Sequence, residues 1–179
     1  MGDPKKQRKK YEPPRHPWRM DQLEAELKLI GEYGLRNKRE LWRYKTMLSK
    51  MRGIARSILG MRGEERERLQ KTYFATMTRL GLLDESARID DALDLTIKNL
   101  LDKRLQTLVY RRGLARTIHE ARAMITHGHV MIGDRRVTAP GYIVKKDEEA
   151  LLKATVQTAP TSGEASSPKR IVNDRSPPA

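Results

Sequence analysis

The spacing of apolar residues predicts a helical body in the first half of the chain. A first helix is expected from about Arg19 to Tyr33. Its apolar stripe consists of Leu23, Leu27 and Ile30, which recur at helical spacing. All nine prolines lie outside residues 18–139, which agrees with a helical body in that range. Two further helices are indicated by one stripe of Leu41, Tyr44, Leu48, Met51, Ala55 and Ile58 and another of Leu69, Tyr73, Met77 and Leu80.

Capping residues mark two helix starts. Asn37 precedes the second stripe and has Glu40 at the capping-box distance. Thr117 and Glu120 repeat this pattern further along the chain. Glycine adopts the left-handed conformation that closes many helices, so Gly128 is the expected end of the helix that starts after Thr117.

Shorter elements are predicted from residue 101 onward. Leu101, Leu105 and Leu108 indicate one short helix ended by Gly113, and the helix after Thr117 follows it. Alternating apolar and polar residues then predict a small antiparallel sheet. Its expected parts are a strand with Val130 and Ile132, a turn at Gly133-Asp134, a return at Val137, and a strand at Tyr142, Ile143 and Val144.

These elements predict an α+β chain in four parts. Residues 1–18 form a basic extension, and residues 19–100 form a helical domain. Residues 101–155 form a small domain of two short helices and an antiparallel sheet. Residues 156–179 are rich in Ser, Pro, Thr and Ala and read as a tail, and both ends of the chain are expected to be disordered.

The charge balance indicates an anionic partner. The 179 residues include 37 Lys and Arg against 23 Asp and Glu, which gives a formal net charge of +14. Cysteine is absent, which excludes disulfides, thiolate nucleophiles and thiolate zinc sites. No apolar run approaches the roughly 20 residues of a membrane span, and the basic N-terminus has no apolar stretch behind it. We therefore expect a cytosolic protein, or a nuclear one if the cell has a nucleus.

Patterns typical of enzymes and metal sites are weak. The four histidines show no HExxH or comparable spacing. Asp90, Asp91 and Asp94 lack the pattern of a calcium loop, so helix capping or a solvated surface explains them better. Phosphate-loop and dinucleotide fingerprints are also missing. The sequence predicts a protein that is not an enzyme and has no metal or cofactor.

The most N-terminal cations are interleaved with aromatic residues. Such a segment can lay its cations along phosphates and stack Tyr11 or Trp18 on an exposed base. A solvated targeting or solubility tail is the alternative, and the aromatic residues favour nucleic acid. The candidate RNA-binding residues of this segment are Lys5, Lys6, Arg8, Lys9, Lys10 and Arg15.

Two further groups of cations follow. Lys38, Lys45, Arg52 and Arg56 fall on one edge of the second helix and form a predicted basic ridge. The third group is mostly arginine, whose planar fork matches phosphate oxygens, although an exposed arginine can equally form a surface salt bridge. It contains Lys103, Arg104, Arg111, Arg112, Arg116, Arg122, Arg135 and Arg136, with His127 and His129 as further candidates.

Two positions in the third group have a more specific rationale. Arg116 directly precedes the capping residue Thr117, beside a helix N-terminus whose amides favour an anion. His127 can either donate to a phosphate or stabilise the C-terminus of its own helix.

Two stretches of this sequence resemble a known family. LDKRLQTLVYRRGLARTIHEAR at 101–122, with ITHGHVMI at 125–132, closely resembles the S4 RNA-binding domain. ELKLIGEYGLRNKRELWR at 26–43 is similar to the helical part of the small-subunit ribosomal protein S4 family in its archaeal and eukaryotic form. The resemblance covers roughly residues 5–150. The chain lacks the N-terminal cysteines of some bacterial members, and residues 145–148 depart from the usual Gly-Asp before the last strand.

The resemblance implies a primary binder of small-subunit ribosomal RNA that nucleates assembly of the subunit body and bears on decoding accuracy. It also implies contact with ribosomal protein S5 and other small-subunit proteins, and a position near the messenger-RNA entry channel. Arg104, Arg116 and Arg122 stand at positions that imply RNA ligands. Positions implied to be structural are Gly113, Ala121, Gly128, Val130 and Pro140. The alternatives are a non-ribosomal assembly factor and an RNA-modifying enzyme that carries the same domain.

Overall fold

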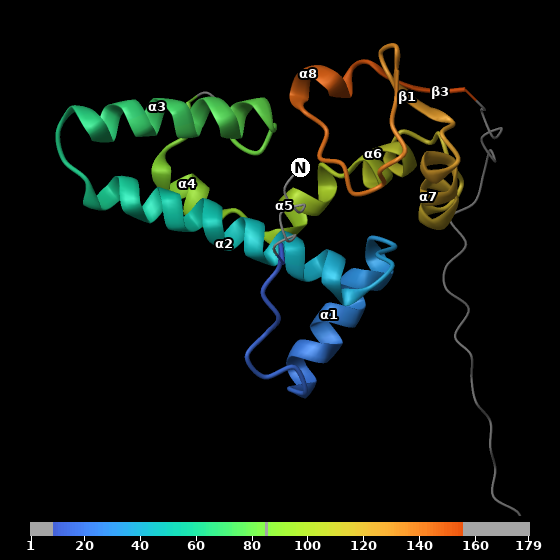
Figure 1. Cartoon of the computed structure of the whole chain (residues 1–179), viewed down its shortest axis with the longest axis horizontal. Helices are drawn as coiled ribbons and strands as arrows, with labels where there is room; N and C mark the ends of the chain where they lie inside the picture. Colours follow the sequence, from blue (N-terminus) through green and yellow to red (C-terminus); the bar gives the residue numbers. More distant parts are fainter. Residues whose placement is uncertain (1–8, 85, 156–179) are drawn as a thin grey trace, which may run out of the picture.

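The chain folds into the predicted α+β arrangement (Figure 1). The computed structural model describes residues 9–84 and 86–155, so the predictions for Lys5, Lys6, Arg8 and the tail from residue 156 lie outside the described residues. Its helices are α1 (Met20–Glu32), α2 (Lys38–Gly60), α3 (Glu64–Arg79), α4 (Ile89–Asp94), α5 (Ile97–Asp102), α6 (Leu105–Arg111), α7 (Ile118–Thr126) and α8 (Lys146–Glu149). Its strands are β1 (Val130–Ile132), β2 (Arg135–Arg136) and β3 (Leu152–Ala154).

Helix α2 is the central element of the first half. Its start is the predicted one, because the Asn37 side chain accepts a hydrogen bond from the Glu40 amide at 3.1 Å. All six residues of the predicted stripe, from Leu41 to Ile58, are buried. Helices α1, α3, α4 and α5 all contact α2. Helix α3 runs back along α2, whereas α1 projects from the opposite side (Figure 1).

Helix α1 has the predicted bounds but not the predicted buried face. The one buried residue on it is Glu26, and Leu27 of the expected stripe is 58% exposed. Ile30 of the stripe packs against buried apolar residues, but the buried face of α1 contains Glu26 rather than Leu27. The prediction that Leu27 faces the core is therefore wrong.

The helix predicted at Leu101 to Leu108 is two helices. Arg104 is extended, with φ −70° and ψ 142°, and separates α5 from α6. The Leu105 amide donates to the Tyr142 carbonyl at 2.8 Å, and the Val144 amide donates to the Lys103 carbonyl at 3.0 Å. The helix breaks here because its backbone pairs with a distant segment of the chain.

The same pairing corrects the sheet. The structure has no regular strand at residues 142–144, where one isolated bridge joins Arg104 to Ile143. Strand β1 instead pairs antiparallel with β2 on one edge and β3 on the other, in the order β2-β1-β3. Ile132 at the end of β1 pairs with Arg135 at the start of β2, which confirms the predicted two-residue turn at residues 133–134. Residues 142–144 are already paired to the α5–α6 connection, so the free edge of β1 is taken by β3.

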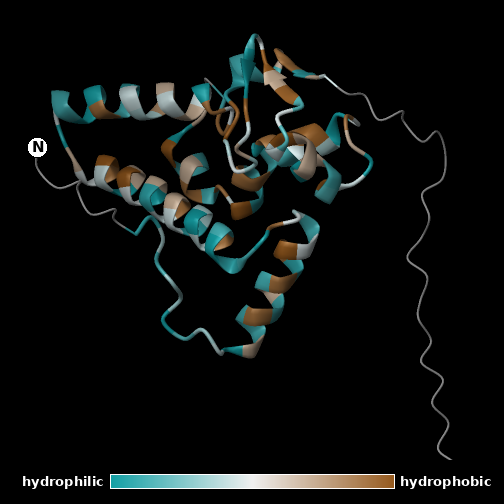
Figure 2. Cartoon of the chain, turned by 45° about the vertical axis from the view of Figure 1, so that its right-hand side comes forward, coloured by the Kyte–Doolittle hydropathy of each residue, from teal (hydrophilic) through white to brown (hydrophobic). Residues whose placement is uncertain are grey.

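The buried apolar residues form two clusters. The first runs from Tyr33 to Leu101 and fills the space between α2 and helices α1, α3, α4 and α5. The second runs from Leu105 to Leu152 and lies among α6, α7 and the sheet. Apolar residues face one another across these contacts, while the outer faces are mostly hydrophilic (Figure 2). The two clusters divide on either side of Arg104.

Candidate nucleic-acid interface

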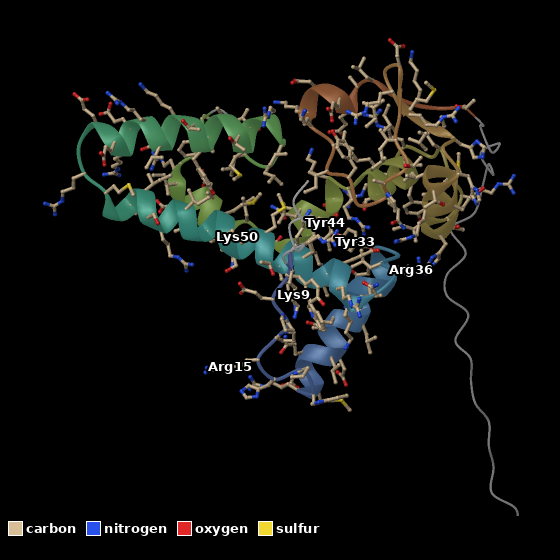
Figure 3. All side chains as sticks on the ribbon, in the orientation of Figure 1. Lys9, Arg15, Tyr33, Arg36, Tyr44 and Lys50 are labelled. Carbon is tan, nitrogen blue, oxygen red and sulfur yellow. The ribbon has the colours of Figure 1, made fainter. Side chains whose placement is uncertain are left out.

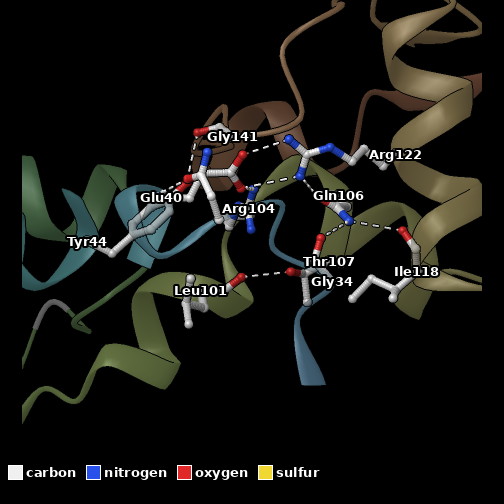
Figure 4. Close-up of polar contacts among 11 residues, drawn as sticks. Gly34, Glu40, Tyr44, Leu101, Arg104, Gln106, Thr107, Ile118, Arg122 and Gly141 are labelled. Carbon is white, nitrogen blue, oxygen red and sulfur yellow. Dashed lines mark hydrogen bonds and ion pairs between the residues drawn. The ribbon is translucent and has the colours of Figure 1, made fainter. Parts of the chain in front are cut away.

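A buried charged junction joins the two hydrophobic clusters (Figure 4). Glu40 on α2 accepts a hydrogen bond from Arg104 at 3.0 Å and one from Arg122 on α7 at 2.6 Å. The Arg104 side chain is completely buried, and those of Arg122 and Glu40 are 21% and 22% exposed. Burial alone would raise the pKa of Glu40, but the hydrogen bond from Arg122 and the charges of Arg104 and Arg122 hold it below its ordinary value. Glu40 is therefore ionised and compensated by two arginines.

Neutral hydrogen bonds surround this ion pair. The Gln106 side chain donates to the carbonyls of Gly34 at 3.1 Å and Ile118 at 3.0 Å. The Tyr44 hydroxyl donates to the Gly141 carbonyl at 3.0 Å. These bonds link the start of α2 to α6, α7 and the loop before residue 142. The junction fixes how the two halves of the molecule are oriented.

The junction changes the roles assigned to two arginines. Arg104 was expected to bind RNA, but it is fully buried against Glu40 and the Tyr44 ring, whose centroid lies 5.4 Å from the guanidinium carbon. Arg122 also pairs with Glu40 and keeps only a fifth of its side chain exposed. The structure does not support direct RNA contact by Arg104. The glutamate that compensates both lies 64 and 82 residues away in sequence, so local patterns gave no sign of it.

The predicted basic ridge of α2 is partly engaged within the protein. Glu26 of α1 is 3% exposed and lies 2.5 Å from the Lys45 ammonium and 3.8 Å from that of Lys38. Burial acts to raise the pKa of Glu26, but Lys45, together with Trp42 and Lys38, lowers it overall. Arg52 donates to the Leu95 carbonyl at 2.7 Å. Of the four predicted residues, these three have partners inside the fold.

The fourth ridge residue, Arg56, is solvent-exposed and forms no ion pair among the described residues. It is the member of the ridge that stays free to meet an external anion. At 100° per residue, Arg56 lies on the same edge of α2 as the other three ridge residues.

A different face of α2 carries exposed cations that the sequence analysis missed. Arg39, Arg43 and Lys50 lie within about 40° of one another on the helix, and Arg36 precedes them. All four are exposed, and none forms an ion pair among the described residues. Figure 3 labels Arg36 beside the start of α2 and Lys50 further along it. We call Arg36, Arg39, Arg43 and Lys50 the α2 outer face. It lies away from the apolar stripe, which is the signal that could have found it.

The N-terminal extension is held on α2 over part of its length. The Tyr11 ring lies on that of Trp42, with centroids 6.0 Å apart, and the Glu12 amide donates to the Thr46 hydroxyl at 3.0 Å. The Lys9 ammonium lies over the Tyr11 ring, 4.8 Å from its centroid. Tyr11 is therefore engaged within the protein. Lys10 and Arg15 are exposed, and Arg15 points away from the ribbon (Figure 3).

The cations of the second half divide into paired and exposed ones. Lys103 and Arg112 lie 3.4 and 4.0 Å from Glu149, and Arg111 lies 2.6 Å from Asp102. The side chains of these three cations line an open hollow of about 440 Å³ between α5, α6 and α8. Among the predicted RNA-binding residues of this half, Arg116, Arg135 and Arg136 are exposed and have no carboxylate partner in the described chain.

Helix α7 brings some of these groups together. Its start is the predicted one, since the Thr117 side chain accepts from the Glu120 amide at 3.1 Å. The Glu120 carboxylate accepts from the Arg116 amide at 2.7 Å, so an internal anion already occupies part of this helix end. Arg116 keeps its exposed side chain, and the backbone amides beside it are less available to phosphate than the sequence suggested.

The other end of α7 gathers two histidines and an arginine. His127 caps the helix, and its ring centroid lies 6.4 Å from that of His129. Gly128 lies between them and has φ 77°. The Arg136 side chain packs closely against Gly128, since a Cβ added at Gly128 would lie 2.8 Å from Arg136 Cδ. All three polar side chains are exposed. This end of α7 can present them to one anionic surface.

Within residues 9–84 and 86–155, no three His, Asp or Glu side chains are grouped so as to hold a metal ion. Asp91 caps α4 by accepting from the Arg88 amide at 2.7 Å, which is the structural role that its sequence context favoured. No described helix combines the length and apolarity needed to cross a bilayer.

The match to known proteins agrees with this geometry. Residues 103–149 match the family model of the S4 domain, which makes this chain an RNA-binding protein of the S4-domain class. Small ribosomal subunit protein uS4 of Hyperthermus butylicus is 53% identical over 162 residues, covering 90% of each chain. That of Ignicoccus hospitalis is 52% identical over 162 residues, covering 90% of this chain and 95% of its own. That of Methanothermobacter thermautotrophicus is 47% identical over 149 residues, covering 83% and 87%. The chain belongs to the small ribosomal subunit protein uS4 family.

Family membership confirms the resemblance drawn from the two quoted stretches. The uS4 family is structural and non-enzymatic, in agreement with the sequence prediction. The alternative of an RNA-modifying enzyme is therefore set aside.

Proposed function

We propose that the chain is a structural constituent of the small ribosomal subunit that binds small-subunit ribosomal RNA through cations on both of its halves. The observation that carries this proposal is the presence, on both halves, of exposed cations that pair with no carboxylate of the described chain. Among them are the α2 outer face and Arg116, Arg135 and Arg136 of the S4 domain. Cations compensated within the fold add little to RNA binding, whereas uncompensated ones displace counterions from phosphates. Membership of the uS4 family supports RNA of the small subunit as the ligand.

The finer role follows from the family resemblance. We propose that binding nucleates assembly of the subunit body and contributes to translational accuracy. The partners would be ribosomal protein S5 and other small-subunit proteins, with messenger RNA near the entry channel. The location would be the ribosome in the cytoplasm. A junction that holds the two halves rigidly supports a nucleating role, because a preorganised protein loses less entropy when it orders RNA.

Salt-dependent binding tests the phosphate contacts. The full chain and its Arg116→Ala variant are titrated with a transcript of the small-subunit ribosomal RNA of Hyperthermus butylicus at several salt concentrations. Arg116→Ala should weaken binding and lower the magnitude of the log–log salt slope by about 0.7 to 0.9, the value for one phosphate contact. Arg68→Ala is the matched control, because Arg68 is 80% exposed and paired with Glu64 on α3. An unchanged slope for Arg116→Ala would remove Arg116 from the interface.

Co-sedimentation tests residence in the subunit. The protein should remain with mature small subunits in moderate salt. Its absence from them would contradict the structural role and would favour the alternative of a non-ribosomal assembly factor.

A further inference from the structure

Trp18 is the most exposed large apolar side chain of the described chain. Its side chain is 88% exposed, which is unusual for tryptophan in a folded region. The chain's other tryptophan, Trp42, is half-buried beneath Tyr11 and donates to Glu26 at 3.2 Å. The sequence offered Tyr11 and Trp18 equally as residues that could stack on a base. In the structure Tyr11 packs on Trp42, whereas Trp18 has no aromatic partner among the described residues.

The backbone holds Trp18 at the tip of a turn. The Arg19 amide donates to the His16 carbonyl at 3.4 Å, which closes a four-residue turn over His16-Pro17-Trp18-Arg19. Pro17 occupies the second position, where its fixed φ favours the turn. Helix α1 begins directly after the turn, at Met20. Trp18 is therefore presented on a constrained backbone, so little entropy is lost when its ring meets a ligand.

The surroundings of Trp18 are positively charged. Arg15 and Arg19 are exposed on either side of it, and residues 13–20 contain no acidic side chain. The turn precedes α1, which projects from α2 on the side opposite α3 (Figure 1). An exposed aromatic ring between cations is the combination with which proteins bind unpaired nucleotides, since the ring stacks on a base while the cations meet the flanking phosphates.

We propose that Trp18 stacks on an unpaired base of the bound RNA, with Arg15 and Arg19 on the adjacent phosphates. This inference rests on the proposed function and adds a contact to it: recognition of a single-stranded nucleotide by the turn before α1. A double-stranded segment would offer this ring no accessible base face, so the turn selects a loop, a bulge or a strand end.

Three variants of the full chain separate stacking from charge. Binding to the Hyperthermus butylicus transcript is measured for Trp18→Ala, Trp18→Phe and Arg15→Ala. Trp18→Ala should raise Kd by about 5- to 100-fold, as expected for the loss of one stacked base, without changing the salt slope. Trp18→Phe should restore most of the affinity, because phenylalanine keeps a stacking face. Arg15→Ala should lower the magnitude of the slope by about 0.7, the value for one contact to a single strand. None of these changes removes a packed side chain, since Trp18 and Arg15 are exposed.

Tryptophan emission gives an independent readout. RNA should quench the emission of the wild-type protein strongly and that of Trp18→Phe weakly, because the latter retains only the covered Trp42. Equal quenching in the two proteins, or wild-type affinity in Trp18→Ala, would overturn the stacking contact. If small-subunit proteins rather than RNA change the Trp18 emission, the turn is a protein docking site and the proposal fails. These outcomes leave the proposed function intact, whereas failure of the wild-type chain to bind the transcript would contradict the function itself.

Discussion

Removal of the Glu40 carboxylate is the most direct test of the junction. In Glu40→Ala the Arg104 guanidinium stays completely buried and loses its carboxylate partner. Its Nε and Nη1 atoms have no hydrogen-bond partner within the described protein even in the wild type, so nothing nearby replaces Glu40. Breaking a buried ion pair on one side typically costs about 3–5 kcal/mol. Because Glu40 and Arg122 are each about a fifth exposed, we expect a loss in the free energy of unfolding near the lower end, about 3 kcal/mol.

Urea unfolding of the full chain at pH 7 measures this loss. Arg68→Ala is the control, because it breaks an ion pair of α3 whose side chains are 80% and 87% exposed. That change should cost less than about 0.5 kcal/mol. A double variant, Glu40→Leu with Arg104→Met, removes the stranded charge and should recover part of the loss. If Glu40→Ala costs no more than Arg68→Ala, the junction does not hold the two halves together as we argue.

The pH dependence of the same variant gives a second check. The pKa of Glu40 lies below its ordinary value of 4.5 in the folded protein, so its ionised form stabilises the fold above that pH. This stabilisation is lost as the pH falls through the depressed folded-state pKa. The difference in stability between wild type and Glu40→Ala should therefore be full at pH 7 and should shrink below about pH 4.5. A constant difference down to pH 2 would show that the carboxylate charge is not responsible.

Two further pairs of variants test the interface and the packing. Arg43→Ala on the α2 outer face should weaken RNA binding and reduce the magnitude of the log–log salt slope by about 0.7 to 0.9. Lys45→Ala should leave that slope unchanged and lower the free energy of unfolding by about 1–3 kcal/mol. A slope change only in Lys45→Ala would reverse our assignment of the two faces. Gly34→Ala should destabilise the fold by about 2 kcal/mol or more, because φ is 55° and the new Cβ would lie 2.8 Å from Ile118 Cγ2. Gly31→Ala should be neutral or stabilising by up to about 1 kcal/mol, since nothing lies within 4 Å of its added Cβ; equal melting temperatures for the two glycine variants would contradict the close approach at residue 34.

Features that depend on neighbouring residues could be predicted from the sequence. The apolar stripe of α2 and the caps at Asn37 and Thr117 were correct, because each is decided within one or two helical turns. The hairpin turn at residues 133–134 was correct for the same reason. Local rules therefore recovered most elements and the α+β class.

Features that depend on distant partners could not be predicted. The ridge on α2 follows from spacing alone, but α1 places the Glu26 carboxylate against Lys38 and Lys45 and so compensates part of the ridge charge. The last strand was misplaced because residues 142–144 pair with the chain around Arg104 before they can join the sheet. Spacing shows which cations share a face, and only the fold shows which of them remain uncompensated.

The junction can affect RNA binding through the orientation of the two halves, even though most of its surface is buried within the protein. Lys50 lies ten residues beyond Glu40 on α2, a distance of about 15 Å at 1.5 Å per residue. A rotation of about 10° at Glu40 would move the Lys50 end of the α2 outer face by roughly 2.6 Å relative to the S4 domain. That displacement is comparable to the length of a charge-assisted hydrogen bond, so it would break simultaneous contact of both surfaces with one rigid RNA. The junction can therefore influence RNA affinity through the angle at which the two cationic surfaces are held, without contact between the buried Arg104 and RNA.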